Sequence, residues 1–372
     1  MTTAERAVEL LIGQAREATG EDRYSAALAA ADAAVQAAEQ LDDPALLVRG
    51  LVEEAAALHM SGDLLGALAR NTRVLGLAED PATRDRLDHP AATWALARAH
   101  MDWVECARFV TGIGARELFG VLDAAESWLS AIGHSDWRAG ILRLRALTHQ
   151  RLGELDAAIA TAQEALAVYQ PDAPGYTLAT YRWTLGDLLR RANRAGEAEP
   201  LYQAILDDPT TGQHDRTVAL EGMAWCALAA QEPDTARRHA DAAVQLADTL
   251  GDDALRTALE VLVAACRAGG DLDSAWQAAT RHLDIGHRLG GHYMLYYATR
   301  DALDIALDRR DQASVDQLLT ELAPHASALD TDTNNTTFAD EVTQRRHLSI
   351  EIEAVERSGT RWWRWHRRLH RG

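Results

Sequence analysis

The side chains in this sequence that could do chemistry are not spaced as an active site requires. Among the 14 histidines, His282, His287 and His292 stand close together in sequence. Their spacing of five residues would place neighbours about 140° apart on a helix, whereas a pair of metal ligands shares one face. No His-Glu-x-x-His, Cys-x-x-Cys or Gly-x-Ser-x-Gly motif occurs. We therefore expect no metal, no cofactor and no catalytic residue.

Arginine is the basic residue of this chain, because all 37 basic residues are arginine and none is lysine. The absence of lysine excludes a lysine Schiff base and a phosphate-binding loop with its lysine. The three cysteines, Cys106, Cys226 and Cys266, are far apart and odd in number. They fit buried thiols in a reducing compartment better than a disulfide framework.

The segment 361–371 differs from the rest of the chain in charge. It holds five arginines and three tryptophans, and without its positive charges the net charge of −19 becomes −24. On a helical wheel the arginines share one arc, Trp362, Trp365 and Leu369 lie opposite, and Trp363 flanks that apolar face. Tryptophan prefers the membrane interface and arginine is drawn to anionic headgroups, so peripheral contact with an anionic membrane is one expectation. Docking on a partner or on the acidic body, and plain disorder, are the alternatives. The contact residues would be Arg361, Trp362, Trp363, Arg364, Trp365, Arg367 and Arg368.

The composition predicts an all-α protein. Apolar residues make up 47% of the chain, and much of that fraction is alanine, in runs such as residues 26–31. Alanine is the strongest helix former and lets helices approach closely. The acidic body lacks the positive footprint that nucleic acid demands. With no signal peptide at the first residues and no apolar run of membrane-spanning length, we expect a cytoplasmic protein.

One short pattern recurs along the chain. A glycine or another turn former is followed by an acidic residue, an apolar residue and then an alanine, as in residues 62–68, 153–159 and 270–276. From Ala158 onward the alanines recur at intervals of 40, 38 and 39 residues, at Ala198, Ala236 and Ala275. Such a period signals stacked helical hairpins. The glycine ends one helix, the acid begins the next, and the alanine sits where two helices cross.

These segments resemble the tetratricopeptide repeat. Leu185-Gly186, Ala198, Tyr202 and Pro209 match positions of its pattern, and Gly153, Ala158, Ala165 and Pro171 match another copy. The longer period is similar to the kinesin-light-chain variety. The resemblance extends over about residues 5–325 and departs most around residues 81–135, where a long first helix, about 91–109, precedes Gly112-Ile113-Gly114.

The resemblance implies a right-handed α-solenoid of about eight helical hairpins with a C-terminal capping helix. We expect the solenoid to span residues 1–329, the capping helix 330–358 and the Arg/Trp-rich tail 359–372. A polar break at residues 330–337 should cap the last helix. The turns are expected near Gly20, Gly62, Gly112, Gly153, Asn193, Gln231, Gly270 and Arg310.

The resemblance also implies a concave groove lined by first-helix side chains, which could hold a carboxylate or an acidic peptide. The alternative is that the arginines pair with nearby acids and the tryptophans pack between helices. The groove residues would be Arg143, Gln150, Arg151, Trp183, Asp187, Arg190, Arg191, Glu221, Trp225, Arg267, Tyr297 and Arg300.

The sequence favours a non-catalytic scaffold or adaptor that binds a protein or peptide partner, itself acidic if the arginines contact it. A regulator that changes conformation on binding a peptide is the first alternative. An accessory subunit of an enzyme complex, or an enzyme with a helical active site, is the second. Neither the partner nor the oligomeric state follows from the sequence.

Overall fold

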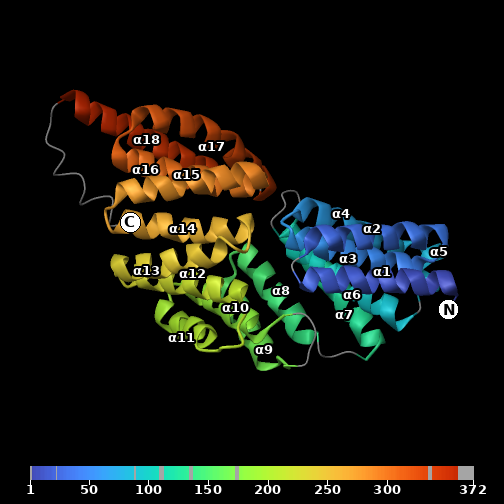
Figure 1. Cartoon of the computed structure of the whole chain (residues 1–372). Helices are drawn as coiled ribbons and strands as arrows, with labels where there is room; N and C mark the ends of the chain where they lie inside the picture. Colours follow the sequence, from blue (N-terminus) through green and yellow to red (C-terminus); the bar gives the residue numbers. More distant parts are fainter. Residues whose placement is uncertain are drawn as a thin grey trace. The chain divides into compact units, whose positions relative to one another are not determined.

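The protein is almost entirely helical. The computed structural model describes residues 2–21, 23–87, 89–108, 113–133, 137–171, 176–333 and 337–358. Helices hold 85% of these residues, and none of them lies in a β-strand (Figure 1). The all-α prediction is therefore confirmed.

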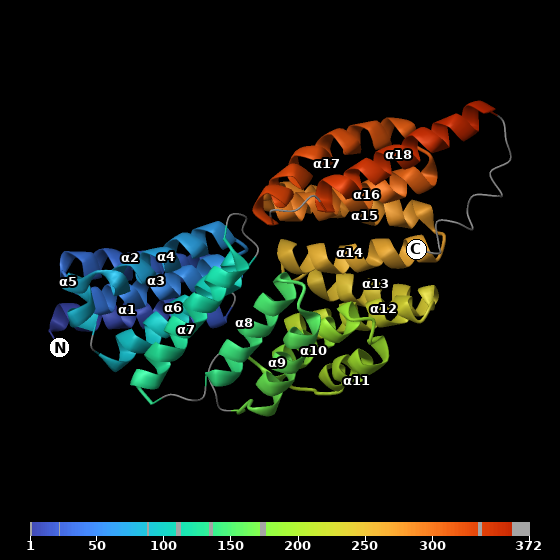
Figure 2. The ribbon, with the colours of Figure 1, turned by 180° about the vertical axis from the view of Figure 1, so that it is seen from behind.

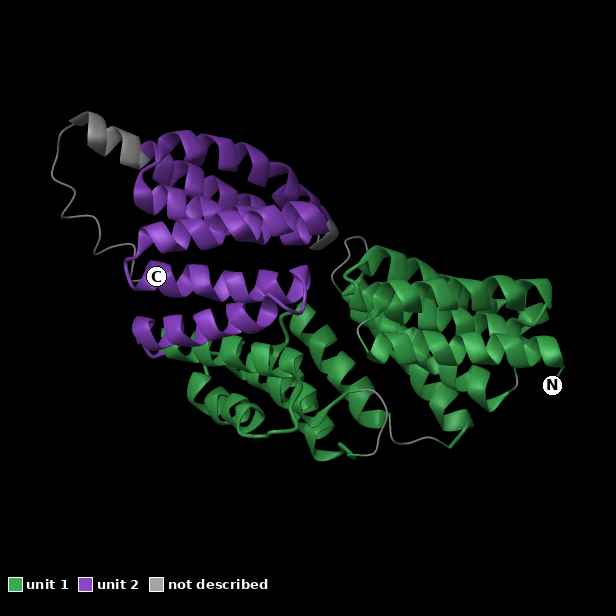
Figure 3. Cartoon of the chain, in the orientation of Figure 1, with its two compact units in different colours: residues 1–229 green, residues 230–372 purple. Residues whose placement is uncertain are grey.

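The helices form two compact units, residues 1–229 and residues 230–372 (Figure 3). Within each unit, consecutive long helices pack against one another, as the ribbon shows from both sides (Figure 1, Figure 2). The helices of unit 1 are α1 (Thr3–Gly20), α2 (Tyr24–Gln40), α3 (Pro44–Met60), α4 (Leu64–Glu79), the short α5 (Pro81–Arg84), the 3-10 helix η1 (Asp85–Leu87), α6 (Pro90–Ala107), α7 (Ala115–Ala131), α8 (Arg138–Arg151), α9 (Leu155–Ala167), α10 (Leu178–Arg191), α11 (Ala195–Leu206) and α12 (Gln213–Ala229). Those of unit 2 are α13 (Pro233–Ala247), α14 (Asp252–Ala268), α15 (Leu272–Leu289), α16 (His292–Arg309), α17 (Gln312–Thr333) and α18 (Thr337–Ser358).

Left-handed backbone conformations end the first helix of most pairs. Six of the predicted turn residues have φ between 58° and 91°, and three of them are not glycine. A residue in this conformation just past a helix end lets its neighbours satisfy the last carbonyls and reverses the chain. The six are Gly62, Gly153, Asn193, Gln231, Gly270 and Arg310. The described helices thus follow in pairs, α1/α2, α3/α4, α6/α7, α8/α9 and α10/α11 in unit 1 and α14/α15 and α16/α17 in unit 2; α12 is the last helix of unit 1 and α13 the first of unit 2.

Small residues lie at the positions where the sequence pattern placed them. Each of the pattern's alanines is fully buried, including Ala67, Ala158, Ala198, Ala236 and Ala275. A buried alanine allows two helices to approach closely, because nothing beyond its Cβ separates the backbones. The prediction that these alanines are buried is confirmed.

An aromatic ring fills the space that two glycines leave in unit 1. Tyr202 of α11 is 2% exposed and packs against Gly186 of α10 and Gly222 of α12. A Cβ added at Gly186 would lie 2.8 Å from Cζ of this ring, and one at Gly222 would lie 2.3 Å from Cε1 and Cζ. Three successive helices are therefore held together by one buried tyrosine.

The region that departs from the repeat pattern contains additional short helices. α5 and η1 precede α6, which spans Pro90–Ala107 where the sequence predicted about 91–109. Gly114 is the N-cap of α7, and Gly112 lies outside the described residues. The longer insertion before α6 explains why the period fails there.

The last helix is capped by the polar stretch that precedes it. The carboxylate of Asp330 accepts hydrogen bonds from the backbone N–H groups of Phe338, at 2.9 Å, and Ala339, at 2.7 Å. The sequence placed Asp330 in a break, whereas residues 330–333 belong to α17. Asp330 can cap α18 from the preceding helix because its side chain crosses to the first free N–H groups.

The contact of Tyr202 with Gly222 gives the first prediction. Replacing Gly222→Ala should destabilise the protein by about 1–3 kcal/mol, because the new methyl group would overlap the buried ring. The measurement is the midpoint of urea unfolding followed by circular dichroism. Gly196→Ala is the matched control, since Gly196 is an exposed residue of α11 with open space around it. It should leave stability unchanged or raise it by up to about 1 kcal/mol. Equal midpoints for the two variants would contradict the packing described.

Candidate binding surface on the first helices

Ion pairs join the first helices of successive pairs in unit 1. Glu53 of α3 is 2% exposed and lies between two arginines. Nη2 of Arg16 on α1 donates to Oε1 of Glu53 at 2.6 Å, and Nη1 of Arg98 on α6 lies 3.4 Å from the same oxygen. One buried carboxylate thus connects three consecutive first helices.

Arg143 of α8 is the most enclosed of the predicted groove residues, at 3% exposure. Its Nη1 donates to Oε2 of Glu105 on α6 at 2.8 Å, and its Nε donates to Oγ1 of Thr184 on α10 at 3.0 Å. The guanidinium carbon lies 4.4 Å from the ring centre of Tyr176 and 5.1 Å from that of Trp183. Arg143 therefore ties α6, α8 and α10 together through two of its donors, and two aromatic rings lie against its guanidinium group.

The charges of these arginines determine the ionisation of the acids. Burial alone would raise the pKa of Glu105, but the positive charges of Arg143 and Arg108 outweigh it and hold the pKa well below its ordinary value of 4.5. Burial would also raise the pKa of Asp187, but the positive charges of Arg191 and Arg190 outweigh it and lower the pKa below its ordinary value. Both acids are consequently negative at neutral pH.

A half-exposed group lies farther along α10. Asp187 accepts a hydrogen bond from Nη2 of Arg190 at 2.5 Å and one from Nε of Arg191 at 2.7 Å. The guanidinium of Arg190 also lies 5.2 Å from the ring centre of Trp225 on α12. The side chains of Arg190, Arg191 and Asp187 remain 20%, 48% and 30% exposed, so solvent reaches this group, unlike Arg143.

The other residues of unit 1 that were predicted to line the groove contact different groups. Nε1 of Trp183 donates to Asp215 at 3.2 Å. Arg151 donates to the backbone carbonyls of Ala107, at 3.1 Å, and Ile113, at 2.8 Å. The remaining two are half-buried, Gln150 on α8 and Glu221 on α12.

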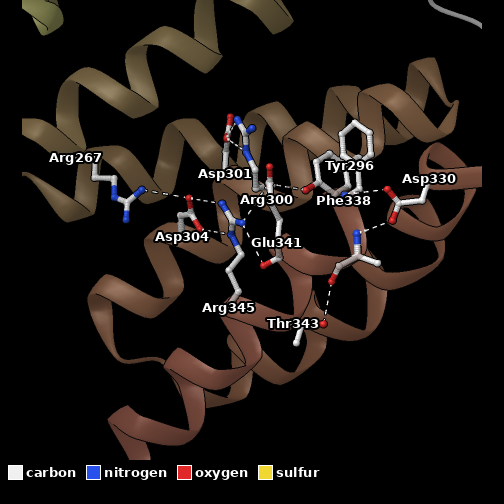
Figure 4. Close-up of polar contacts among 11 residues, drawn as sticks. Arg267, Tyr296, Arg300, Asp301, Asp304, Asp330, Phe338, Glu341, Thr343 and Arg345 are labelled. Carbon is white, nitrogen blue, oxygen red and sulfur yellow. Dashed lines mark hydrogen bonds and ion pairs between the residues drawn. The ribbon is translucent and has the colours of Figure 1, made fainter. Parts of the chain in front are cut away.

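Unit 2 repeats the arrangement of unit 1 with other residues (Figure 4). Arg267 of α14 donates to Asp308 at 2.6 Å and to Asp304 at 3.2 Å, and both acids belong to α16. Arg300 pairs with its neighbour Asp301 at 2.9 Å and lies 4.6 Å from the ring centre of Tyr297.

The structure gives internal binding partners to the arginines that were predicted to line the groove. It brings Arg143 to Trp183, Asp187 to Arg190 and Arg191, and Arg300 to Tyr297. Each of the four arginines predicted on α8 and α10 binds an internal carboxylate or carbonyl. The groove as a binding surface remains a prediction.

Sequence reasoning missed the acids that join the first helices. Glu53 and Glu105 were not singled out, nor was Tyr176, whose hydroxyl donates to Glu105 at 3.3 Å. The available signal was an acid and an arginine separated by about one repeat, because the paired residues lie 37, 45, 38 and 37 positions apart. These pairs are Arg16/Glu53, Glu53/Arg98, Glu105/Arg143 and Arg267/Asp304.

The structure also bears on the cysteines, on metal binding and on membrane contact. The three cysteines are buried and free, and burial raises the pKa of Cys226 to about 11. In the described ranges no three histidine, cysteine or acidic side chains are arranged to hold a metal ion. No helix among those described is long and apolar enough to cross a membrane. The tail residues 361–371 lie outside the described residues, so their contact with a membrane or partner stays a prediction.

Removing the carboxylate of Glu105 tests the buried pair. Glu105→Gln should cost about 3–5 kcal/mol of unfolding free energy, because Arg143 would keep a buried charge without its counterion. The control is Glu126→Gln, which breaks an exposed contact with Arg145 and should cost about 1 kcal/mol or less.

The same comparison has a defined pH dependence. A lowered carboxylate pKa contributes stability that is complete above the ordinary value of 4.5 and is lost as pH falls through the folded-state value. The difference between wild type and Glu105→Gln should therefore be constant from pH 7 to pH 5 and shrink only at lower pH. A difference that disappeared near pH 6 would exclude an ionised Glu105 as its source.

Comparison with known proteins gives a family for part of the chain and a fold for most of it. Residues 137–207, from the start of α8 to the end of α11, match the tetratricopeptide repeat family. No curated protein matches the chain.

Solved structures share the fold at low sequence identity. A crystal structure of a Rap protein complexed with Competence and Sporulation Factor has a TM-score of 0.57 at 13% identity, over 94% of this chain and 99% of that one. The apo form of RapI has a TM-score of 0.51 at 12% identity, over 95% and 99%. The apo form of the quorum sensor NprR from B. thuringiensis has a TM-score of 0.50 at 13% identity, over 92% and 99%. Residues 137–207 are thus a tetratricopeptide-repeat segment, and paired helices with buried alanines continue on both sides of it.

Proposed function

We propose that the protein is a non-catalytic scaffold or adaptor that binds a protein or peptide partner on the first-helix face of unit 1. The observation that carries the proposal is the half-exposed group on α10 and α12, formed by Asp187, Arg190, Arg191 and Trp225. It combines two guanidinium groups and an indole ring with one carboxylate, and arginine and tryptophan are among the side-chain types that dominate binding energy at protein interfaces.

Exchange of ion-pair partners would let this group bind an acidic ligand. Two arginines share the single carboxylate of Asp187, so a ligand carboxylate could take one of them while the other keeps its internal partner. Arg143 could not respond in this way, because it is buried between two rings and bound to Glu105 and Thr184. The proposed contact therefore lies on Arg190 and Arg191, with Trp225 as the apolar part.

A regulator that responds to a ligand is the second candidate. It is favoured by the similarity in fold to the Rap protein complexed with Competence and Sporulation Factor and to the quorum sensor NprR. In that case a ligand would bind the same face and shift the conformation, so it would have to favour one conformation over the other. A cytoplasmic location, and the longer-period kinesin-light-chain type of repeat, belong to this proposal as well.

A photo-crosslinker placed on the proposed face identifies the partner in the native host. The full-length chain would carry a photoreactive amino acid at Gln150, which is half-buried on α8, or at Glu199, which is exposed on the second helix α11. We expect an adduct from position 150 that position 199 does not give, and mass spectrometry would name the partner. Adducts of equal identity and yield from both positions would exclude a specific first-helix face.

The purified partner then tests the arginines. The double variant Arg190→Ala, Arg191→Ala should bind at least about tenfold more weakly, corresponding to about 1.4 kcal/mol. The double variant Arg138→Ala, Arg145→Ala is the matched control, since it removes two charges whose acceptors lie on the second helices α7 and α9. It should bind like wild type. Unchanged affinity of the first variant, measured by calorimetry with its helicity intact, would remove this group as the docking site.

A further inference from the structure

Polar contacts fasten the last helix of unit 2 to the two helices before it (Figure 4). Arg345 of α18 donates from Nε and Nη2 to both carboxylate oxygens of Asp304 on α16, at 2.7 and 3.1 Å. The hydroxyl of Tyr296 on α16 donates to Glu341 at 2.7 Å. Nε2 of Gln312 on α17 donates to Oγ of Ser349 at 2.9 Å.

The apolar part of this contact is small. Among residues 337–350, whose side chains the structure describes, Val342 is the one fully buried apolar residue. The ring of Phe338 meets the edge of Tyr296 with their centres 4.9 Å apart, but Phe338 itself is only partly buried. Ile350 is 57% exposed. Residues 337–350 of α18 therefore contribute one buried apolar side chain to this contact.

Asp304 would keep a partner after such a release. Its carboxylate is shared between Arg345 of α18 and Arg267 of α14 (Figure 4). Loss of Arg345 would thus not leave Asp304 as an uncompensated charge, which is the costly outcome for an enclosed acid.

The beginning of α18 is attached to α17 independently of these contacts. Asp330 of α17 accepts from the backbone N–H groups of Phe338 and Ala339, which are main-chain donors that any helix start provides. Any helix start that offers free N–H groups satisfies the same carboxylate. The side chains of α18 that contact α16 have a fixed spacing: an aromatic ring, a carboxylate three residues later and an arginine four residues after that.

We propose that the face of unit 2 formed by Tyr296, Asp304 and Gln312 is an exchangeable helix-binding surface. α18 occupies it in the free chain, and an amphipathic helix of a partner protein with the same aromatic–Glu–Arg spacing takes its place. Charge complementarity supports this occupant, because Asp304 accepts an incoming guanidinium and Tyr296 donates to an incoming carboxylate. The inference rests on the proposed binding function but uses a different surface, in unit 2.

The covalent connection between α17 and α18 explains why α18 occupies this surface in the free chain. A helix joined by a short connection competes at an effective concentration on the order of millimolar. The side chains of Arg345 and Asp304 are only 16% and 19% exposed, so their ion pair contributes more than a fully exposed pair, and weakening it shifts the balance toward a helix added in trans.

A peptide with the sequence of residues 337–358, labelled with a fluorophore, serves as the probe. It is titrated into three full-length proteins: wild type, Arg345→Glu and the matched control Arg346→Glu. Arg346 is exposed on the same helix, so its change alters the charge equally without touching Asp304. Hydrogen exchange of the amides of residues 338–350 reports the release of α18, and exchange in α14 and α16 reports whether the rest of unit 2 stays folded. Arg345→Gln, without charge repulsion, is the variant to use if Arg345→Glu loses protection in α14 and α16.

We expect faster exchange in α18 and at least tenfold tighter peptide binding for Arg345→Glu, with Arg346→Glu like wild type. A peptide that itself carries the Arg345→Glu change should not bind. The proposal is overturned if α18 is released and the peptide still fails to bind, or if exchange in α18 does not change. Concentration-dependent dimers of wild type that exchange α18 would assign the surface to a second copy and overturn the partner helix. The crosslinking experiment in unit 1 is independent, so failure there leaves this result unaffected.

Discussion

Close approach of helices at residues without large side chains is the constraint on which the rest of this structure depends. The repeating alanines are fully buried, and two glycines of α10 and α12 make room for the single ring of Tyr202. Protein interiors are packed as densely as organic crystals, so a ring that fills such a space fixes the spacing of three helices at once. The first helices are thereby set close enough for an arginine on one to reach a carboxylate on the next, as Arg143 reaches Glu105.

The ion pairs between first helices follow from that spacing and have different consequences at different depths. Arg143 and Glu105 are enclosed, and the cost of separating them makes the link between α6 and α8 permanent. Asp187 and its two arginines are half-exposed, and water or a ligand can replace one partner at little cost. Burial therefore decides which of the charges on one helix face hold the fold and which are available for binding.

The sequence predicted the fold because its signals are local. Turn residues such as Gly153 and Gly270, and the alanines that follow them, act within a few positions of one another, and each was found where it was expected. Even the non-glycine turns at Asn193, Gln231 and Arg310 were located by the spacing of the repeat. The candidate site was predicted less well. The partner of Arg143 lies 38 residues away, and no local pattern shows that an arginine on a predicted groove is covered by two aromatic rings.

The contacts of an interior helix and those of the terminal helix differ in how easily they can be exchanged. An interior helix such as α8 has a neighbour on each side within its unit, so its charged side chains are enclosed from two directions. Among the described helices, the terminal helix α18 contacts α16 and α17, which precede it, and Val342 is its one buried apolar side chain among residues 337–350. Repeat proteins need a polar terminal helix to meet water, and the same polarity weakens its attachment. In this chain, Asp304 retains Arg267 when Arg345 departs, so the geometry that closes the end of the repeat array also allows that end to be opened by a helix of matching charge.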